Sequence, residues 1–535
     1  MLYKSQLLQS MWRQIRISAA FPYISLLIWI LPLLLFTSGQ NSLMAHDEGL
    51  YAWRARRMFD SGDWIAPWGT VHHKTPGFYW IIASAYTLFG MSEVSARIPS
   101  AIAGILCLLL IYEIGKIILN KKIAWLAAAI LSVEFLWLQH CRLGAPDVPM
   151  IFLILLAIFS LLKAELQLKY SVFWRLIAGL CLGVGFFIRS FMIFLPAIAL
   201  LPYLISEHRR HRHLTSPVLY LGLGLGFIPT LSWLWFSWER YGSDSLDALW
   251  QFVFQVGSQG HAGNGIMFYL WNVPLKAFPW GFLSLLGLVV AFRRPIPRYH
   301  LLLVGFPIVL FTELTIFSAR LSHYSLGLYP FIALLAALGL DWSGKIYETT
   351  KQLRNIPRNL SYGFGGLGIL LLVAGIYVLI WGNADIRQYA PLGLIVGLSC
   401  LILPVVWIGR HRFGYKFLTG SYWLAGWLIP CWLALAVAGS LGLIGDYNPA
   451  FRTFFQEPAI ASILQTQPIY FVKVDGKNAV LLNFYTPIHG TALDTISQLP
   501  ASGFAWIYPK NSPDLSRPHR IVGTMQDYQM IQVLP

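Results

Sequence analysis

Residues 98–138 read IPSAIAGILCLLLIYEIGKIILNKKIAWLAAAILSVEFLWL, two apolar runs joined by a short segment that carries Lys116, Lys121 and Lys122. A helix needs about 20 mostly apolar residues to cross a hydrocarbon core about 30 Å thick. Each run approaches that length, and lysines between two spans are typical of a loop on the cytoplasmic side of a membrane. The stretch therefore predicts a hairpin of two membrane-spanning helices.

Similar apolar runs recur from Phe21 to about Gly445. The composition agrees, because 57% of the 535 residues are hydrophobic and 12% are charged, whereas soluble domains have about 25% charged residues. We therefore expect a membrane all-α fold with about 13 transmembrane helices. The expected spans are 21–38, 98–118, 123–139, 149–162, 175–189, 191–205, 215–237, 271–292, 299–317, 323–340, 361–382, 390–409 and 421–445.

The net charge of +16 raises the question of a nucleic-acid partner, and the placement of the basic residues argues against one. Of the 39 lysines and arginines, 22 fall in seven short segments on one side of a consistent alternation of spans. This is the positive-inside pattern of membrane proteins. The seven segments are Lys4–Arg16, Lys116–Lys122, Lys163–Arg175, Arg209–Arg212, Arg293–Arg298, Lys345–Arg358 and Arg410–Lys416.

Two domains are expected. Residues 1–445 form the transmembrane domain, with a long first outer loop at 39–97 whose segments Gly49–Asp60 and Phe78–Phe89 suit helices in the membrane interface. Residues 446–535 change to short apolar runs such as Ile469–Val474, with a turn signal at Asp475-Gly476, and predict a small α/β domain. An odd number of spans places this domain on the outer side. The five cysteines show no C-x-x-C spacing, so neither a disulfide framework nor a zinc knuckle is indicated.

Ionisable residues gather at the outer ends of the expected spans, where hydropathy does not require them. Because all are predicted at the same membrane face, one cavity can hold them together. Taken singly, each also fits a plain structural role, such as a solvated loop end, a snorkelling lysine, a surface histidine pair or a loop ion pair. The residues are Asp47, Glu48, His72, His73, Lys74, Arg142, Asp147, Arg189, His261, Arg320, His323 and Tyr324.

This collection suits transfer of a group from a lipid-linked phosphate. Cations such as Lys74, Arg189 and Arg320 can stabilise a leaving phosphate as negative charge develops on it. A carboxylate such as Asp47 can accept the proton of an attacking hydroxyl. The cytoplasmic loops are short and contain no phosphate-binding glycine motif, which argues against a nucleotide-sugar donor.

The order and spacing of several short motifs over residues 40–340 resemble one family. The motifs are Asp47-Glu48 with Tyr51, Ser61-Gly62-Asp63-Trp64, Lys74-Thr75-Pro76, Tyr79-Trp80, Leu88-Phe89-Gly90, Ala96-Arg97, Gly144-Ala145-Pro146-Asp147, Phe278-Pro279-Trp280, His323-Tyr324 and Leu328-Tyr329-Pro330. They resemble the GT-C membrane glycosyltransferases of the aminoarabinose (lipid A) transferase and protein O-mannosyltransferase type. Two positions depart from the pattern: Leu50 stands where some relatives carry an arginine, and Arg189 where a lysine is common.

The resemblance implies an inverting glycosyltransferase of the bacterial inner membrane, with a polyprenyl-phosphate sugar as donor and an active site that faces the periplasm. Its acceptor would be a lipid A-type glycolipid, a protein hydroxyl or a polysaccharide. Asp47 is implied as the catalytic carboxylate, with Glu48 as a second candidate, and Lys74 as the contact to the donor phosphate. No cofactor is required, and a divalent metal near Lys74 is compatible with the family. The remaining expectations are Arg189, Arg320 and Tyr324 at the phosphate, Tyr51, Arg142, Asp147 and His323 as supports of the cavity, and His73 and His261 as metal ligands.

The competing class is a transporter or flippase of lipid-linked sugars, which also requires polar residues at the outer face. Such transporters are usually built from repeated halves with broken helices at the membrane midplane, and the sequence shows no internal repeat.

Overall fold

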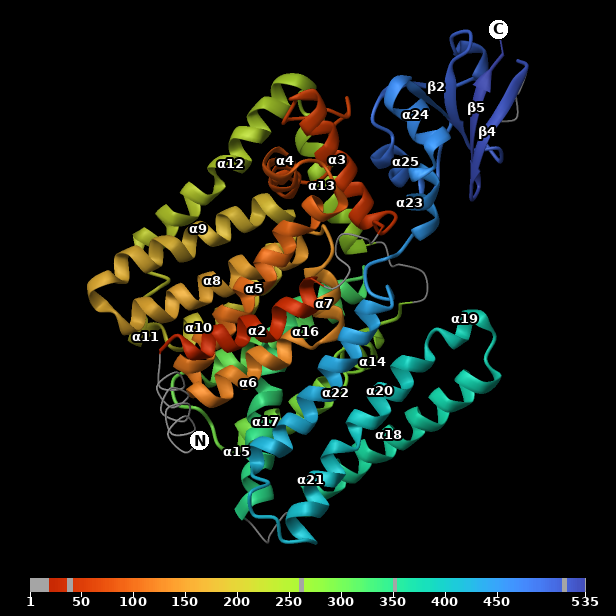
Figure 1. The fold of residues 1–535 in the computed structure, drawn as a ribbon. Coiled ribbons are helices and arrows are strands. Elements are labelled where there is room, and N and C mark those ends of the chain that lie inside the picture. Colours follow the sequence, from red (N-terminus) through yellow and green to blue (C-terminus); the bar gives the residue numbers. More distant parts are fainter. Residues whose placement is uncertain (1–18, 36–41, 259–263, 350–353, 512–516, 535) are drawn as a thin grey trace, which may run out of the picture.

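The computed structural model describes residues 19–35, 42–258, 264–349, 354–511 and 517–534. Helices form a long bundle, and a small domain with a five-stranded sheet lies at one end of it (Figure 1). This confirms the predicted class, a helical membrane protein with a small C-terminal α/β domain. The helices of the bundle are α2 (Phe21–Leu35), α3 (Asp47–Ser61), α4 (Gly77–Phe89), α5 (Glu93–Ile118), α6 (Lys121–Ser132), α7 (Phe135–Cys141), α8 (Asp147–Leu166), α9 (Ser171–Arg189), α10 (Phe194–Ser206), α11 (His208–His211), α12 (Pro217–Tyr241), α13 (Asp244–Ser258), α14 (Phe268–Lys276), α15 (Trp280–Arg293), α16 (Phe306–Ile316), α17 (Tyr329–Thr349), α18 (Asn355–Trp381), α19 (Ala384–Arg387), α20 (Ala390–Cys400), α21 (Ile402–His411) and α22 (Gly420–Ser440).

The hairpin predicted from residues 98–138 is present as α5 and α6. The turn between them is short. Helix α5 ends at Ile118, and the side-chain oxygen of Asn120 accepts a hydrogen bond from the backbone N–H of Ile123 at 3.0 Å. A side-chain acceptor of this kind satisfies one of the unpaired N–H groups at the start of a helix. The two helices pack against each other along the bundle.

The number of spans differs from the expectation. Within the described residues, eight helices are long and apolar enough to cross a membrane, or up to ten if each of two bent pairs is one span. All thirteen expected segments contain helix, but the count of thirteen is not confirmed. Phe21–Leu35 and Leu301–Ile316 are shorter than a full span, and Leu168–Ser206 is one helical stretch where we expected two spans.

Two spans expected to be straight are broken. The segment 123–139 divides into α6 and α7, which are bent by 71°, and 271–292 divides into α14 and α15, which are bent by 105°. At the second break Pro279 immediately precedes α15, and proline has no N–H to continue the hydrogen bonds of a preceding helix.

Helices α9 and α12 approach each other closely along small residues. A Cβ atom added to Gly179 would lie 2.0 Å from the carbonyl oxygen of Leu219, and one added to Gly222 would lie 2.1 Å from that of Leu176. Glycines four residues apart, as in Gly179/Gly183, let the backbones of membrane helices touch. This contact fixes the end of α9 at Arg189, which the site uses.

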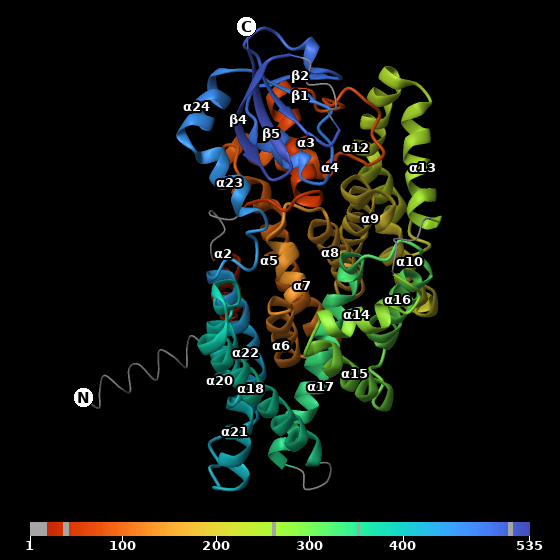
Figure 2. The same cartoon turned by 90° about the vertical axis from the view of Figure 1, so that its right-hand side faces the viewer.

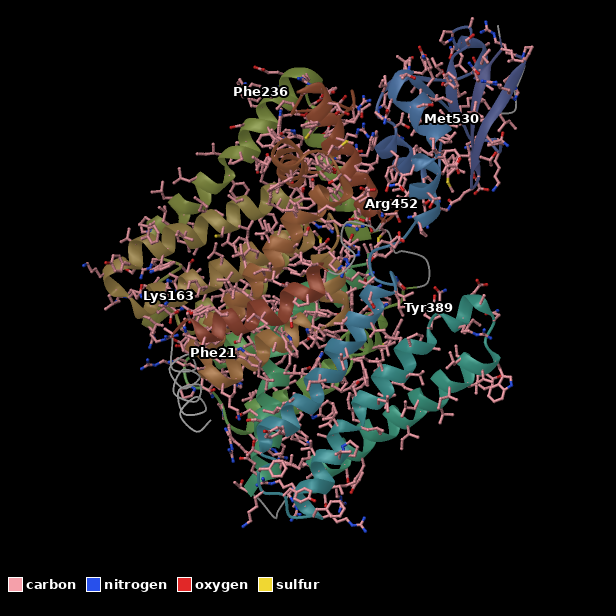
Figure 3. All side chains as sticks on the ribbon, in the orientation of Figure 1. Phe21, Lys163, Phe236, Tyr389, Arg452 and Met530 are labelled. Atoms are coloured by element: carbon pink, nitrogen blue, oxygen red, sulfur yellow. The ribbon has the colours of Figure 1, made fainter. Side chains whose placement is uncertain are left out.

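The loops expected on opposite membrane faces lie on opposite sides of the bundle. In Figure 3 the labelled Phe21 and Lys163 lie on the left, whereas Tyr389 and Arg452 lie on the right, and Arg452 is close to the sheet domain. Figure 2, turned by 90°, shows α21 away from the sheet domain, which stands above α3 and α4. We call the end that carries α3, α4 and the sheet domain the upper end and the other end the lower end.

The C-terminal domain contains a mixed sheet with strand order β2-β1-β3-β5-β4. β1 pairs in parallel with β2 and β3, and β5 pairs antiparallel with β3 and β4. The apolar run at 479–482 is helical and belongs to α25. The elements are α23 (Pro449–Gln456), α24 (Pro458–Thr466), β1 (Ile469–Val472), α25 (Ala479–Tyr485), β2 (His489–Leu493), β3 (Phe504–Ile507), β4 (His519–Met525) and β5 (Tyr528–Val533).

The C-terminal domain packs against α3 through α25. Arg56 donates from Nη1 to the carbonyl oxygen of Phe484, and Tyr485 donates its hydroxyl to Glu93 Oε1 at 3.0 Å. Gly49 allows this approach, because a Cβ atom there would lie 3.0 Å from the side chains of Val480 and Leu481. The helix that begins at Asp47 is thus held from outside the membrane bundle.

Candidate active site

The first turns of α3 place three functional side chains on one face. Asp47, Tyr51 and Arg54 are spaced by four and three residues, so they share a side of the helix. Asp47 is the first residue of α3 and is 61% exposed, a position where the helix dipole stabilises a carboxylate. The preceding His46 has φ 74°, a left-handed conformation that is strained for a residue with a side chain and is enriched at functional sites.

Lys74 is held by the residue that follows it. Thr75 donates its backbone N–H to Ser190 Oγ at 3.0 Å and its hydroxyl to the carbonyl of Phe186 at 3.0 Å. Gly77 closes the contact, since an added Cβ would lie 2.5 Å from the carbonyl oxygen of Phe187. The Lys-Thr-Pro turn is therefore bonded directly to the end of α9.

Arg189 ends α9 beside that turn. It donates from Nη1 to the hydroxyl of Tyr51 at 2.8 Å and from Nη2 to Asp147 Oδ1 at 2.9 Å. Ser190 follows with φ 50°, a second strained residue with a side chain next to a site residue. Asp147 is buried and supplies the anionic partner that an arginine at this depth requires.

A small cavity of about 50 Å³ lies at this place and is lined by Tyr51, Lys74, Thr75, Ile188, Arg189, Ser190, Met192 and Tyr324. The Lys74 ammonium lies 5.7 Å from the centroid of the Tyr51 ring. Burial lowers the pKa of Lys74, and the positive charges of Arg189 and Arg54 lower it further. A negative ligand is favoured here because it would offset three neighbouring cations.

Two histidines surround Asp147 on the far side of Arg189. The rings of His140 and His323 stack with centroids 5.8 Å apart, and His323 meets Tyr324 edge to face at 4.7 Å. The negative charges of Asp147 and Asp47 both act on this pair. His323, Asp147 and His140 thus lie together beside Arg189 and Tyr324, which line the cavity.

Glu48 is not a second carboxylate of the cavity, which corrects the expectation. It is fully buried, and both of its oxygens accept hydrogen bonds: Oε1 from Arg97 Nε at 2.6 Å and the N–H of Gly144 at 2.9 Å, and Oε2 from Arg97 Nη2 and the N–H of Met44, both at 2.8 Å. Arg97 also donates to the carbonyls of Ser42 and Gly445. Glu48 therefore ties α3, α5 and the segment leading to the C-terminal domain together.

Arg142 and Arg320 are also placed outside the cavity. Arg142 is buried and donates from Nη1 to the carbonyl of Leu33 at 2.8 Å. Arg320 donates from Nε and Nη2 to the carbonyl of Thr315 and from Nη1 to that of Asn264. Through these bonds to backbone carbonyls Arg142 holds the end of α2, and Arg320 holds the end of α16 and the segment at Asn264. Neither is among the residues that line the cavity.

The residues next to Lys74 do not fit a metal ion. His261 lies outside the described residues. His73 belongs to no group of three metal-binding side chains in the described part of the chain, and burial lowers its pKa to about 4, with further lowering by Lys74 and Arg54. Those two cations would also oppose a metal cation. Glu165, His211 and His213 do form such a group, but at the lower end, where Arg210 bonds Glu165 at 2.6 Å.

Arg54 was not singled out from the sequence. Its guanidinium lies 5.5 Å from the Trp68 ring centroid and donates to the hydroxyl of Tyr79 at 3.1 Å and to Nε2 of His72 at 3.2 Å. The signal that identifies Arg54 is its helical spacing from Asp47 and Tyr51. His140 and Ser190 gave no comparable signal, because only the fold brings them to the site.

An apolar chamber adjoins the polar cavity. It shares Met192 and Tyr324 with that cavity and is otherwise lined by Met150, Ile151, Ile154, Leu155, Leu195, Pro196, Phe306, Leu310, Leu314, Gly327 and Phe331. A cationic cavity followed by an apolar chamber matches an amphipathic ligand with a charged head and a hydrocarbon tail.

Comparisons with known proteins agree with this architecture. The family described as dolichyl-phosphate-mannose-protein mannosyltransferase matches residues 73–236. An undecaprenyl phosphate-alpha-4-amino-4-deoxy-L-arabinose arabinosyl transferase of Pectobacterium atrosepticum is 28% identical over 80% of this chain and 77% of its own. An uncharacterised protein of Aquifex aeolicus is 26% identical over 62% of this chain, and the chain spans 66% of that relative's length.

The crystal structure of ArnT from Cupriavidus metallidurans bound to undecaprenyl phosphate superposes with a TM-score of 0.73, at 19% identity, over 96% of this chain and 98% of that chain. The chain therefore has the same fold as that protein. The sequence matches are to glycosyltransferases of the aminoarabinose transferase and protein mannosyltransferase type, the resemblance that the motifs predicted.

Proposed function

We propose that this chain transfers a sugar from a polyprenyl-phosphate donor to a lipid A-type glycolipid at the periplasmic face of a bacterial inner membrane. The observation that carries the proposal is the cavity in which Lys74 and Arg189 lie beside each other and next to an apolar chamber. The head of a polyprenyl phosphate would bind the two cations, and its first isoprene units would occupy the chamber. The relatives' name and the resemblance to the lipid A transferases support the donor and the acceptor.

The proposed chemistry is a single displacement. The acceptor hydroxyl attacks the anomeric carbon, the bond from that carbon to the phosphate oxygen breaks, and the electron pair leaves with the polyprenyl phosphate. Lys74 and Arg189 stabilise the charge that develops on the phosphate, and Asp47 accepts the proton of the hydroxyl. Attack from the face opposite the phosphate inverts the anomeric configuration.

The other residues position this machinery. Asp147 holds the Arg189 guanidinium, Tyr51 receives a hydrogen bond from it, and Tyr324 forms the wall between the polar cavity and the apolar chamber. His323 packs between Tyr324 and His140 and keeps that wall in place. Asp47 lies close enough for its charge to act on Tyr51, Lys74 and Arg189.

The test is transfer by the purified full-length protein. It is incubated with lipid A and with undecaprenyl phosphate that carries either 4-amino-4-deoxy-L-arabinose or mannose. The masses of the products are measured by mass spectrometry. A mass increase of lipid A by one sugar from either donor is expected, and the preferred donor names the sugar. No product from either donor with monodisperse protein would contradict the proposal.

A further inference from the structure

A second polar pocket lies at the lower end of the bundle, far from the donor cavity, where α18 begins and α21 ends (Figure 1). It has a volume of about 380 Å³ and is lined by Arg354, Asn355, Arg358, Tyr362, Trp407, Ile408, His411 and Arg412. The positive-inside pattern predicts this end in the cytoplasm. None of these residues takes part in the proposed transfer.

The pocket presents donors from three sources. Three of its lining residues are arginines, and arginine binds phosphate with two parallel hydrogen bonds. The 27-residue helix α18 starts in the pocket at Asn355, and no side chain in the described part of the chain caps its first turn. The open N–H groups and the dipole of a helix N-terminus favour an anion.

The third donor is a ring nitrogen of His411. Arg354 donates from Nη2 to His411 Nδ1 at 2.8 Å, so in the neutral ring the proton is on Nε2. Nε2 is buried and has no hydrogen-bond partner among the described residues. A buried donor without a partner costs stability, and an acceptor inside the pocket would remove that cost.

Among the described residues, no acidic side chain lines the pocket. The carboxylate of Glu348 is nearby in the fold, but it accepts the backbone N–H of Gly420. A carboxylate beside a lysine or arginine offsets its positive charge. The described residues that line this pocket include no carboxylate, so the charges of its three arginines are not offset within the lining. The pocket therefore has the electrostatic character of a site for a dianion or a phosphodiester.

Exposed aromatic side chains occur in the pocket lining and in the loop next to it. Tyr362 lines the pocket, and Phe413, Tyr415 and Phe417 lie in the loop after α21. Exposed aromatic residues that alternate with Arg412 and Lys416 are typical of the headgroup region of a bilayer. The loop next to the pocket thus has the composition of a segment that lies at the level of lipid phosphates.

We propose that the pocket between α18 and α21 binds the phosphate of an anionic phospholipid headgroup from the predicted cytoplasmic leaflet. Arg354, Arg358 and Arg412 hold the phosphate oxygens, the N–H groups at the start of α18 and His411 Nε2 complete the set of donors, and the aromatic loop packs on the acyl chains. Basic pockets between membrane helices bind anionic lipids in this way. The site fixes the lower ends of α18 and α21 to each other.

The test is native mass spectrometry of the full-length protein in mild detergent, titrated with phosphatidylglycerol or with zwitterionic phosphatidylethanolamine of the same acyl chains. The variant Arg358→Gln/Arg412→Gln removes two exposed cations of the pocket. The variant Arg293→Gln/Arg294→Gln removes two exposed arginines at the same predicted end that do not line it. Size-exclusion chromatography confirms that both variants are folded.

We expect phosphatidylglycerol to bind in preference to phosphatidylethanolamine, and the pocket variant to weaken this binding about thirtyfold, with the control close to the parent protein. Glycerol phosphate, which has the headgroup phosphate without acyl chains, should not displace the lipid at equal concentration. Displacement by glycerol phosphate that depends on Arg358 and Arg412 would support phosphate binding and assign it to a soluble ligand. Equal binding of the two lipids, or equal loss in the pocket variant and the control, would overturn the proposal.

Discussion

The neighbouring carboxylates Asp47 and Glu48 belong to two different regions of the molecule. Asp47 is exposed at the start of α3, and its charge acts on Lys74 and Arg189, whereas Glu48 is fully buried and bonded to Arg97 and two backbone N–H groups. Successive residues of a helix point about 100° apart, so the first side chain reaches solvent and the next faces the protein. We therefore propose Asp47 for the reaction and assign Glu48 to the architecture that positions it.

The largest expected effect is on stability. Glu48→Ala leaves the Arg97 guanidinium buried without its carboxylate, and loss of one partner of a buried ion pair costs about 3–5 kcal/mol. Thermal unfolding in detergent should show a clearly lower Tm for Glu48→Ala. Asp47→Ala serves as the control and should unfold near the parent Tm, because that side chain is exposed. Equal losses of stability in the two variants would remove the distinction.

The next effect is on turnover. Asp47→Asn keeps the shape of the side chain and removes the base, so transfer to a hydroxyl acceptor should fall by at least about a hundredfold, the lower end for general-base catalysis. The measurement is kcat with saturating donor, on protein with an unchanged Tm. Turnover close to that of the parent protein would exclude Asp47 as the base.

Lys74→Ala should raise the KM for the donor by about ten- to a hundredfold, since a hydrogen bond to a charged group contributes about 1.5–3 kcal/mol. Lys74→Arg should recover part of this loss, because the charge persists while the geometry changes. A donor KM that is unchanged in Lys74→Ala would mean that Lys74 only anchors the loop at the membrane surface.

The smallest effect concerns pH. The pKa of Lys74 is lowered from its ordinary value of 10.5 by burial and by Arg189 and Arg54. Lysine binds phosphate in its protonated form, so donor affinity should be lost as pH rises through this lowered pKa. Arg54→Gln removes one of the lowering charges and should shift the alkaline limb of kcat/KM to higher pH, whereas Lys74→Arg should abolish that limb. If neither substitution changes the alkaline limb of the kcat/KM profile, that limb reports the titration of a group other than Lys74.

The sequence predicted the helical class, the hairpin of α5 and α6, the α/β domain and four of the eight residues that line the cavity. Hydropathy and charge placement act locally along the chain, so these features are readable without a structure. The structural roles of Glu48, Arg142 and Arg320 could not be predicted from the sequence. A charged residue near the end of a span gives the same sequence signal whether it faces a cavity or a backbone carbonyl. The partners that decide this, such as Gly144 and Asn264, are distant in sequence and meet only in the fold.

The sequence also does not show which of the spans are broken. Hydropathy averages over a window, and a break such as the one at Glu134 between α6 and α7 leaves the mean apolar. Arg54 shows the opposite case, since its helical spacing from Asp47 was visible in the sequence once α3 was assigned.

The most direct test of the account is a structure of the full-length protein with undecaprenyl phosphate, determined by electron cryomicroscopy. The account predicts phosphate oxygens about 3 Å from Lys74 Nζ and from the Arg189 guanidinium, with the first isoprene units between Tyr324 and Leu310. A phosphate bound elsewhere, out of reach of both Lys74 and Arg189, would contradict the account.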